Sequence, residues 1–301
     1  MSLPLLSYLS FTVIFILLSW ALYLPYRCGQ LYLAPVYTIA IGAYFAAYTT
    51  TAWSWPVLLA IVVSPLIGAF FAFLPAIGLR RAPGFTTAIA SLALIFILQT
   101  VLRNLKFLGG ALGLFAIPPL DYPLTTLAVV LFVSGTIVYR IDHSRLGRAA
   151  ELLYYSREEA ACFGPDLALV SIMMQVLSGA LSALAGALYA FAVGSVFPDA
   201  FGFSILVVIF PIVFIGGTLT MWGTVVMAAV LWGIPLVLPE AVIDWKDVIY
   251  GAILVCVLDL RPEGVVSKEL VRKVGLRAQS LASAVRCAWM SKKGAGAGDA
   301  L

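Results

Sequence analysis

Residues 167–193 read LALVSIMMQVLSGALSALAGALYAFAV, a run without a single charged side chain. An α-helix needs about 20 predominantly apolar residues to cross the roughly 30 Å hydrocarbon core of a bilayer. This run is long enough, and it is not isolated. Met1–Tyr26 has no charged residue, and Leu167–Pro239 has only Asp199. The run therefore predicts a transmembrane helix, and the segments around it predict several more.

The composition of the whole chain supports the same interpretation. It is 63% hydrophobic and only 11% charged, with a mean hydropathy of +1.07. Soluble domains average nearer 25% charged residues. A transmembrane barrel would require segments of about ten residues that alternate apolar and polar side chains, and the sequence lacks that pattern. We therefore expect an all-α fold, a polytopic transmembrane helical bundle.

Nine apolar segments predict about nine spans, within a range of eight to ten. They are Leu5–Pro25, Leu31–Trp53, Pro56–Leu79, Phe85–Leu102, Tyr122–Tyr139, Leu167–Val193, Phe203–Ile215, Gly223–Leu238 and Val248–Leu260. Four of them contain a proline that would kink or break a helix: Pro35, Pro65, Pro211 and Pro235. Broken helices in membranes often mark transport pathways. Simple kinks that serve packing are the alternative.

One long polar segment interrupts this apolar chain. Arg140–Asp166, RIDHSRLGRAAELLYYSREEAACFGPD, holds nine of the 32 charged residues. Its residues from Leu146 to Phe163 favour a helix, and Gly164-Pro165 is a natural stop. The pattern predicts a helix outside the membrane that meets a soluble partner. A solvated connecting helix without a partner is the alternative.

The distribution of Lys and Arg predicts the domain organisation and the orientation. Residues 1–261 form a membrane domain with a polar loop at 140–166, and residues 262–301 form a basic, partly disordered tail that can lie on anionic lipid. Cytoplasmic segments carry an excess of Lys and Arg. The loop and the C-terminal tail should therefore be cytoplasmic and the N-terminus outside. Arg103 and Lys106 then fall outside, against the trend.

Several functional classes are excluded by motifs that the sequence lacks. There is no GxxxxGK[ST] loop for ATP, no HExxH and no GxSxG. His143 is the only histidine, and the four cysteines form no CxxC pair, so we expect no metal site. The net charge of +4 comes largely from the tail and requires no nucleic acid. The acidic residues Asp121, Asp199 and Asp259 lie near span ends, which disfavours proton-coupled transport.

The second half of the chain carries motifs in an ordered series. They are Ser144–Ala149 (SRLGRA), Glu159–Gly164 (EAACFG), Leu181–Ala190 (LSALAGALYA), Pro198–Phe201 (PDAF), Gly216–Gly223 (GGTLTMWG) and Arg261–Gly264 (RPEG). In order and spacing they resemble permeases of the branched-chain amino acid ABC-transporter family. The first half is less similar. Gly42-Ala43-Tyr44 matches a family motif, whereas Ala34-Pro35 stands where the family usually has Gly-His.

The resemblance implies a set of partners and a location. A permease of this kind pairs with a second, homologous permease subunit, two cytoplasmic ABC ATPases and a periplasmic solute-binding protein. It lies in the bacterial inner membrane as a multi-pass protein with a cytoplasmic C-terminus. The ATPases would bind ATP, so this chain would carry no cofactor and would not be an enzyme. The cargo would be a branched-chain amino acid or a related small polar or carboxylated solute.

The resemblance also implies site residues. For docking and coupling to the ATPases we expect Glu151, Arg157, Glu158, Glu159, Ala160, Ala161 and Gly164. For the translocation path we expect Tyr37, Gly42, Tyr44, Tyr189, Gly216 and Gly217. Local pairing of Glu158 with Arg157 is one alternative. Tyrosines that only pack and glycines that only shape a tight turn are others.

Two other functions stay open at this point. A stand-alone secondary transporter of small solutes would work without partners and would need an ionisable residue near the middle of the membrane. A non-transporting membrane scaffold would have no path that water can enter.

Overall fold

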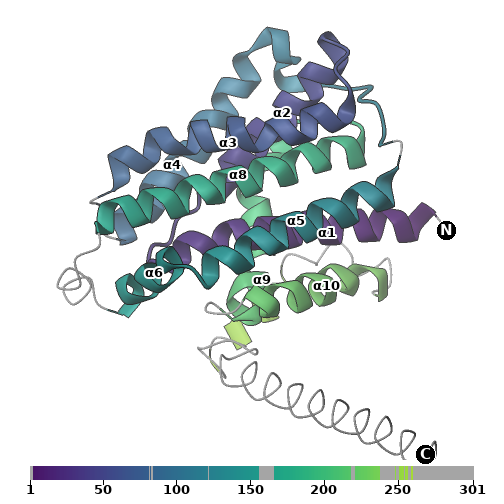
Figure 1. The fold of residues 1–301 in the computed structure, drawn as a ribbon. Helices are drawn as coiled ribbons and strands as arrows, with labels where there is room; N and C mark the ends of the chain where they lie inside the picture. The colour runs from purple at the N-terminus through teal and green to yellow at the C-terminus, as the bar shows by residue number, and fades with distance from the viewer. Residues whose placement is uncertain are drawn as a thin grey trace, which may run out of the picture.

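The computed structural model describes residues 3–80, 82, 84–120, 122–155, 166–217 and 221–237, together with 248, 251–253, 255–256 and 259. Helices make up its regular structure (Figure 1). They are α1 (Leu3–Tyr26), α2 (Pro35–Ala52), α3 (Val57–Leu79), α4 (Gly84–Asn104), α5 (Pro123–Asp142), α6 (Arg145–Tyr155), α8 (Leu167–Val193), α9 (Phe203–Gly216) and α10 (Met221–Val237). Short 3₁₀ helices lie between them. They are η1 (Lys106–Leu108) and η2 (Gly110–Leu112) between α4 and α5, and η3 (Pro198–Phe201) between α8 and α9.

Among the described residues, five helices are long and apolar enough to cross a membrane, namely α1, α3, α4, α5 and α8. Two shorter apolar helices, α9 and α10, also match predicted spans. The all-helical, multi-pass architecture is therefore confirmed, while the count of nine spans stays a prediction. Most of the ninth predicted span, Val248–Leu260, lies outside the described residues.

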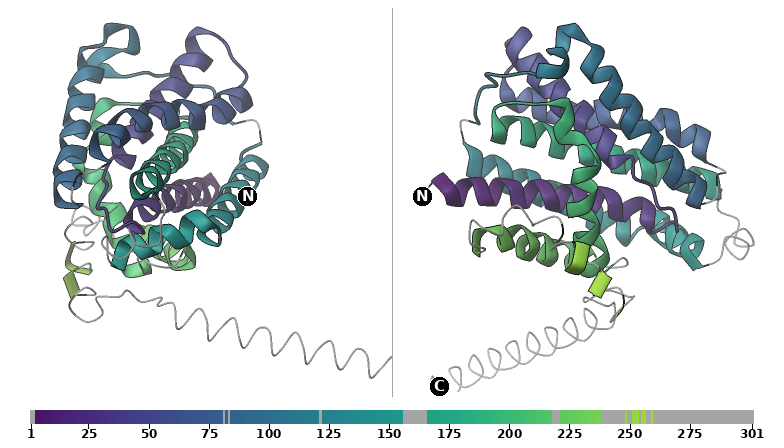
Figure 2. Two further views of the ribbon diagram at one scale, coloured as in Figure 1. Left: turned by 60° about the vertical axis from the view of Figure 1, so that its left-hand side comes forward. Right: turned by 180° about the vertical axis from the view of Figure 1, so that it is seen from behind.

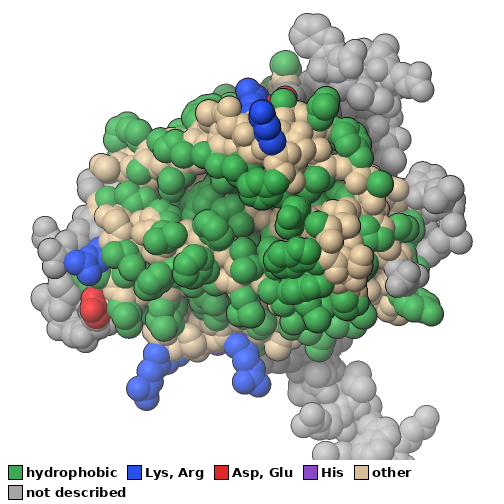
Figure 3. Space-filling view, turned by 90° about the horizontal axis from the view of Figure 1, so that it is seen from above, with side chains coloured by type: hydrophobic (Ala, Val, Ile, Leu, Met, Phe, Trp, Pro, Cys, Tyr) green, Lys and Arg blue, Asp and Glu red, His purple; other side chains and the backbone are tan. Residues whose placement is uncertain are grey.

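Burial differs sharply between the long helices. In an apolar stretch of 18 residues taken from each helix, the buried share is 67% for α1 and 50% for α8. The share is 28% for α3 and for α4, and 17% for α5. Figure 2 shows α1 and α8 side by side at the centre, with the other helices around them. On the face seen in Figure 3, hydrophobic side chains predominate, and the charged side chains stand near its margins. An apolar surface of this kind suits a lipid environment rather than water.

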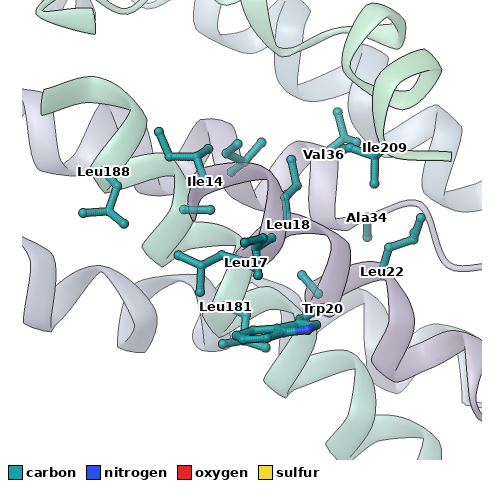
Figure 4. Close-up of a cluster of buried hydrophobic side chains, with 14 of the residues drawn as sticks. Ile14, Leu17, Leu18, Trp20, Leu22, Ala34, Val36, Leu181, Leu188 and Ile209 are labelled. Carbon is teal, nitrogen blue, oxygen red and sulfur yellow. The ribbon is translucent and has the colours of Figure 1, made fainter. Parts of the chain in front are cut away.

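The core forms where α1 crosses α8, α2 and α9. Ile14, Leu17 and Leu18 of α1 are at most 1% exposed, and they pack with Leu188 of α8 and Ile209 of α9 (Figure 4). These aliphatic side chains fill the space between the helices without polar atoms to satisfy. They hold α1 and α8 as one unit.

The contact of α8 with α2 and α3 depends on small residues. A Cβ at Gly42 of α2 would overlap the carbonyl oxygen of Ala183, and a Cβ at Gly186 would overlap that of Ile39. At α3, a Cβ on Gly179 would lie 2.9 Å from the carbonyl oxygen of Gly68. Small residues let the backbones of membrane helices approach closely. The three helices therefore meet backbone to backbone.

The prolines do not break the helices in the way the sequence predicted. Pro65 lies inside α3 and Pro211 inside α9, and both helices continue through them. Pro35 occupies the first turn of α2, where the missing N–H costs nothing because it has no helical partner. The expectation of a break at these three positions was wrong. The irregular backbone lies instead at residues 27–34, between α1 and α2, which we call the elbow.

The polar loop forms a helix only in part within the described residues. Its first half is α6, which follows α5 after a turn at His143 and Ser144. Residues 156–165 lie outside the described residues, so the predicted continuation to Gly164 stays a prediction. Asp166 caps α8, because its carboxylate accepts hydrogen bonds from the backbone N–H groups of Ala168 and Leu169 at 3.0 and 3.3 Å.

Gly42→Ala tests the close contact of α2 with α8. The added methyl group must displace the Ala183 carbonyl, so we expect a loss of about 1–3 kcal/mol of stability, the usual cost of overpacking. Gly78→Ala in α3 is the matched control, because nothing lies within 4 Å of a Cβ there. It should change stability by less than about 0.5 kcal/mol. Thermal unfolding of the detergent-purified protein measures both, and equal effects would contradict the packing assignment.

Candidate functional site

A buried arginine lies at the start of the elbow, where α1, α5 and α6 meet. The side chain of Arg27 is 4% exposed and forms ion pairs with Asp142 at the end of α5 and with Glu151 of α6, the second at 2.9 Å. Tyr23 donates a hydrogen bond of 3.1 Å to the Asp142 carboxylate. A buried charge is tolerated only when it is paired and hydrogen-bonded. We call these four residues the arginine cluster.

The elbow continues into the interior as a polar segment. Gln175 of α8 donates a hydrogen bond of 2.8 Å to the side-chain oxygen of Gln30, and Gln30 donates one of 3.4 Å to Ser171. The backbone N–H of Leu33 donates to the Ser91 hydroxyl of α4 at 3.0 Å. These side chains are all buried. The elbow is not helical, and its backbone is satisfied partly from within, since the N–H of Tyr32 donates to the Gln30 carbonyl at 3.0 Å. The Gln30 side chain and the N–H of Leu33 instead find their partners on α8 and α4.

Further polar groups follow along α2. Tyr37 donates a hydrogen bond of 2.8 Å to the Phe71 carbonyl of α3, and the hydroxyl groups of Thr38 and Ser182 bond each other. Tyr44 is also buried, two turns farther along α2. Together the buried side chains of this series, which we call the polar column, are Gln30, Tyr32, Tyr37, Thr38, Tyr44, Ser171, Gln175, Ser178 and Ser182. All of them are uncharged.

Three atoms of the polar column find no hydrogen-bond partner among the described residues. They are the hydroxyl groups of Tyr32 and Tyr44 and the side-chain oxygen of Gln175. Most buried polar atoms are hydrogen-bonded, and exceptions call for an explanation such as a function. An oxygen with a free lone pair can accept a hydrogen bond from a solute or from water. The column therefore offers free polar groups inside an otherwise apolar bundle.

The structure brings together two of the residues predicted for the path. The rings of Tyr44 and Tyr189 both pack edge-on against Phe201 of η3, with centroid distances of 6.4 and 5.3 Å. They lie at the end of the bundle opposite α6, since α2 and α8 end there. Tyr37 lies nearer the elbow, at the beginning of α2.

The predicted glycines lie in close backbone contacts. Gly42 faces Ala183, and Gly216 lies against the backbone of Gly223 at the turn between α9 and α10. Gly217 in that turn has φ +102°, a conformation that other residues rarely adopt. These positions fit the interpretation of tight turns and close packing.

Only one of the residues predicted for ATPase coupling is described. Glu151 pairs with Arg27, inside the protein, although its side chain remains 33% exposed. The other six, Arg157, Glu158, Glu159, Ala160, Ala161 and Gly164, lie outside the described residues.

Sequence reasoning missed the arginine cluster and the glutamine pair. The sequence did hold a signal for both. Arg27 is the only charged residue before Arg80, and Gln175 is the only amide side chain between Leu167 and Val193. An isolated polar residue in an apolar segment is a candidate functional residue. The identity of its partners could not be read from the sequence.

The opposite end of the bundle carries a second ion pair. The Arg103 guanidinium at the end of α4 donates to the Asp199 carboxylate of η3 from its Nε at 3.0 Å. Both side chains are exposed, by 52% and 72%. Of the two positive charges that opposed the predicted orientation, that of Arg103 is therefore neutralised locally by Asp199.

The chain was compared with known proteins. Residues 5–258 match the family described as the permease component of branched-chain amino acid transport systems. Neither a curated protein nor a solved structure matches the chain.

Arg27→Met tests the arginine cluster. The substitution leaves Asp142 largely buried without its cation, so we expect a loss of roughly 3–5 kcal/mol of stability. Arg103→Met is the matched control, since an exposed ion pair contributes at most about 1 kcal/mol. Thermal unfolding in detergent compares the two variants. A loss no larger for Arg27→Met than for Arg103→Met would contradict the assignment.

Proposed function

The chain belongs to the family of permease components of branched-chain amino acid transport systems, and from this we propose that it is the membrane-spanning subunit of an ABC importer. Its cargo would be a branched-chain amino acid or a related small polar or carboxylated solute. The chain would supply the path through the membrane, and separate ATPase subunits would supply the energy.

The polar column is the observation that carries this proposal. It runs from the elbow along α2 and α8, and it leaves the hydroxyl groups of Tyr32 and Tyr44 and the Gln175 side-chain oxygen without hydrogen-bond partners among the described residues. A solute that carries hydrogen-bonding groups loses its water when it enters a bilayer, and unsatisfied groups there cost several kcal/mol each. Free polar groups along the path compensate this loss. Because the column is uncharged, it can serve a solute without holding it tightly.

The energy must come from outside the chain, since the sequence has no ATP-binding loop. The segment Arg157–Gly164 follows α6 directly, and we propose that it docks the ATPases. Glu158 and Glu159 would pair with basic residues of those subunits, and ATP-driven closure would displace this segment together with α6. A second, homologous permease and a periplasmic solute-binding protein would complete the importer, with specificity residing chiefly in the binding protein. In this arrangement α6 and the C-terminal tail face the cytoplasm of the bacterial cell.

The alternative of a stand-alone secondary transporter requires an ionisable group in the middle of the path. The ionisable groups of the arginine cluster lie at helix ends instead, where α1 and α5 finish. A non-transporting scaffold would have no use for unpartnered polar groups in its interior. Both alternatives are distinguished from the importer by a transport measurement.

The chain is reconstituted in proteoliposomes with the ATPases, the second permease and the binding protein of the proposed importer. We expect uptake of labelled solute only when ATP and all subunits are present, because the chain has no energy source of its own. Leucine is the first solute to use, and binding measurements on the solute-binding protein identify others. Uptake by the chain alone along an ion gradient would overturn the proposal.

Docking is tested separately by Glu159→Arg and Gly164→Pro. The first reverses the charge that would meet the ATPase, and the second alters the backbone at the end of the docking segment. We expect both to abolish co-purification of the ATPases. Lys106→Glu, at η1 on the opposite end of the bundle, is the control and should co-purify normally. If the ATPases still co-purified with Glu159→Arg and Gly164→Pro, the assignment of the docking site to Arg157–Gly164 would be contradicted.

A further inference from the structure

The helix α6 is attached to the elbow at two points. Glu151 pairs with Arg27 at 2.9 Å. About one turn later the backbone of Tyr154 faces Gly29, and a Cβ on Gly29 would lie at van der Waals distance, 3.5 Å, from the Tyr154 Cα. The ring of Tyr154 packs against that of Tyr26, the last residue of α1, at a centroid distance of 6.0 Å. An ion pair and a neighbouring aromatic contact thus join one face of α6 to the elbow and to the end of α1.

The elbow is attached in turn to the interior of the bundle. Gln30 accepts a hydrogen bond from Gln175 of α8, and the N–H of Leu33 bonds Ser91 of α4. Only two residues, Cys28 and Gly29, lie between Arg27 and Gln30. A displacement of α6 that moves Arg27 therefore reaches the polar column through a continuous series of direct contacts.

Apolar grooves flank the helix α5 on two sides. One apolar groove of about 340 Å³ lies between α5, α3 and α8, and another of about 540 Å³ lies between α5, α1 and α10. Within the described residues α5 packs chiefly against α1 and α6. Asp142 at its end is held by Arg27. The two helices α5 and α6 are thus fastened to the elbow by one guanidinium, with grooves on both sides of α5.

An arginine suits this position because of its geometry. The planar guanidinium presents its donors in a rigid fork and can hold two carboxylates at fixed angles, whereas a lysine is a single mobile point charge. Here the two carboxylates come from different helices. The guanidinium group therefore fixes the position of α5 and α6 relative to the elbow.

We propose that Arg27 is a positioning residue for transport, which transmits the movement of α6 to the elbow and so to the polar column. The inference rests on the proposed function, because it assigns to the ATPases the force that moves α6. Breaking the arginine cluster should therefore uncouple ATP hydrolysis from solute transport. The ATPases would still dock and hydrolyse ATP, but their movement would no longer change the polar column.

The test uses Glu151→Gln and Arg27→Lys in the complete reconstituted importer. Glu151→Gln removes one charge at a partly exposed position and should leave the fold intact. Because Glu151 was also expected to couple to the ATPases, co-purification of the ATPases with this variant is measured as well and should be unchanged. Loss of co-purification would assign Glu151 to docking and overturn the inference. Uptake and ATP hydrolysis are measured in the same proteoliposomes. We expect hydrolysis to change by less than about twofold while solute moved per ATP falls roughly fivefold or more, the lower range of typical coupling between sites. Arg27→Lys should retain part of the solute moved per ATP, because lysine keeps the positive charge but lacks the planar set of guanidinium donors.

Arg103→Gln is the matched control, since it breaks the exposed ion pair at the other end of the bundle and should leave the ratio unchanged. A proportional loss of uptake and hydrolysis in Glu151→Gln, or no loss at all, would overturn the inference. Failure of the proposed function has a different signature, because the wild-type complex would then show no ATP-dependent uptake. The two failures are therefore separated by the wild-type measurement.

Discussion

The close contact of α8 with α2 and α3 is the constraint on which the rest of the structure depends. At Gly42, Gly179 and Gly186 the backbones touch, and no side chain larger than hydrogen fits. Such proximity gives lipid no room between the helices, and it brings Ser182 within reach of Thr38. The polar column exists only because its two sides are this near. Replacing the small residues would remove the neighbours that satisfy the polar groups.

The sequence predicted the parts of the fold that composition alone controls. Apolar length locates a span because a bilayer has a fixed thickness, and α1, α3, α4, α5 and α8 accordingly lie where they were expected. Prolines were a weaker guide. Both α3 and α9 continue through their prolines, so a proline alone did not locate a helix end. The elbow was predicted in part. The expected spans left residues 26–30 between them, whereas residues 31–34 were assigned to the second span and precede α2 in the structure.

The candidate site was predicted less well than the fold, for a physical reason. Tyr44 and Tyr189 were identified by a family motif and a polar edge, and the structure brings them to the same phenylalanine. The partners of Arg27 could not be identified in this way, because pairing between distant segments depends on how helices associate. Glu151 illustrates the limit. Its position in a polar loop suggested an outside partner, yet the structure turns it toward a buried arginine.

The arginine cluster has a consequence for the order in which the protein is made. Arg27 and Glu151 are separated by 124 positions in the sequence. A ribosome synthesises the N-terminal part first, so α1 and α2 enter the bilayer while the carboxylates that neutralise Arg27 do not yet exist. The guanidinium must stay in contact with water or lipid head groups until α5 and α6 emerge. Closure of the elbow is therefore a late event in biogenesis, and the first two helices acquire their final arrangement only after the sixth has been synthesised.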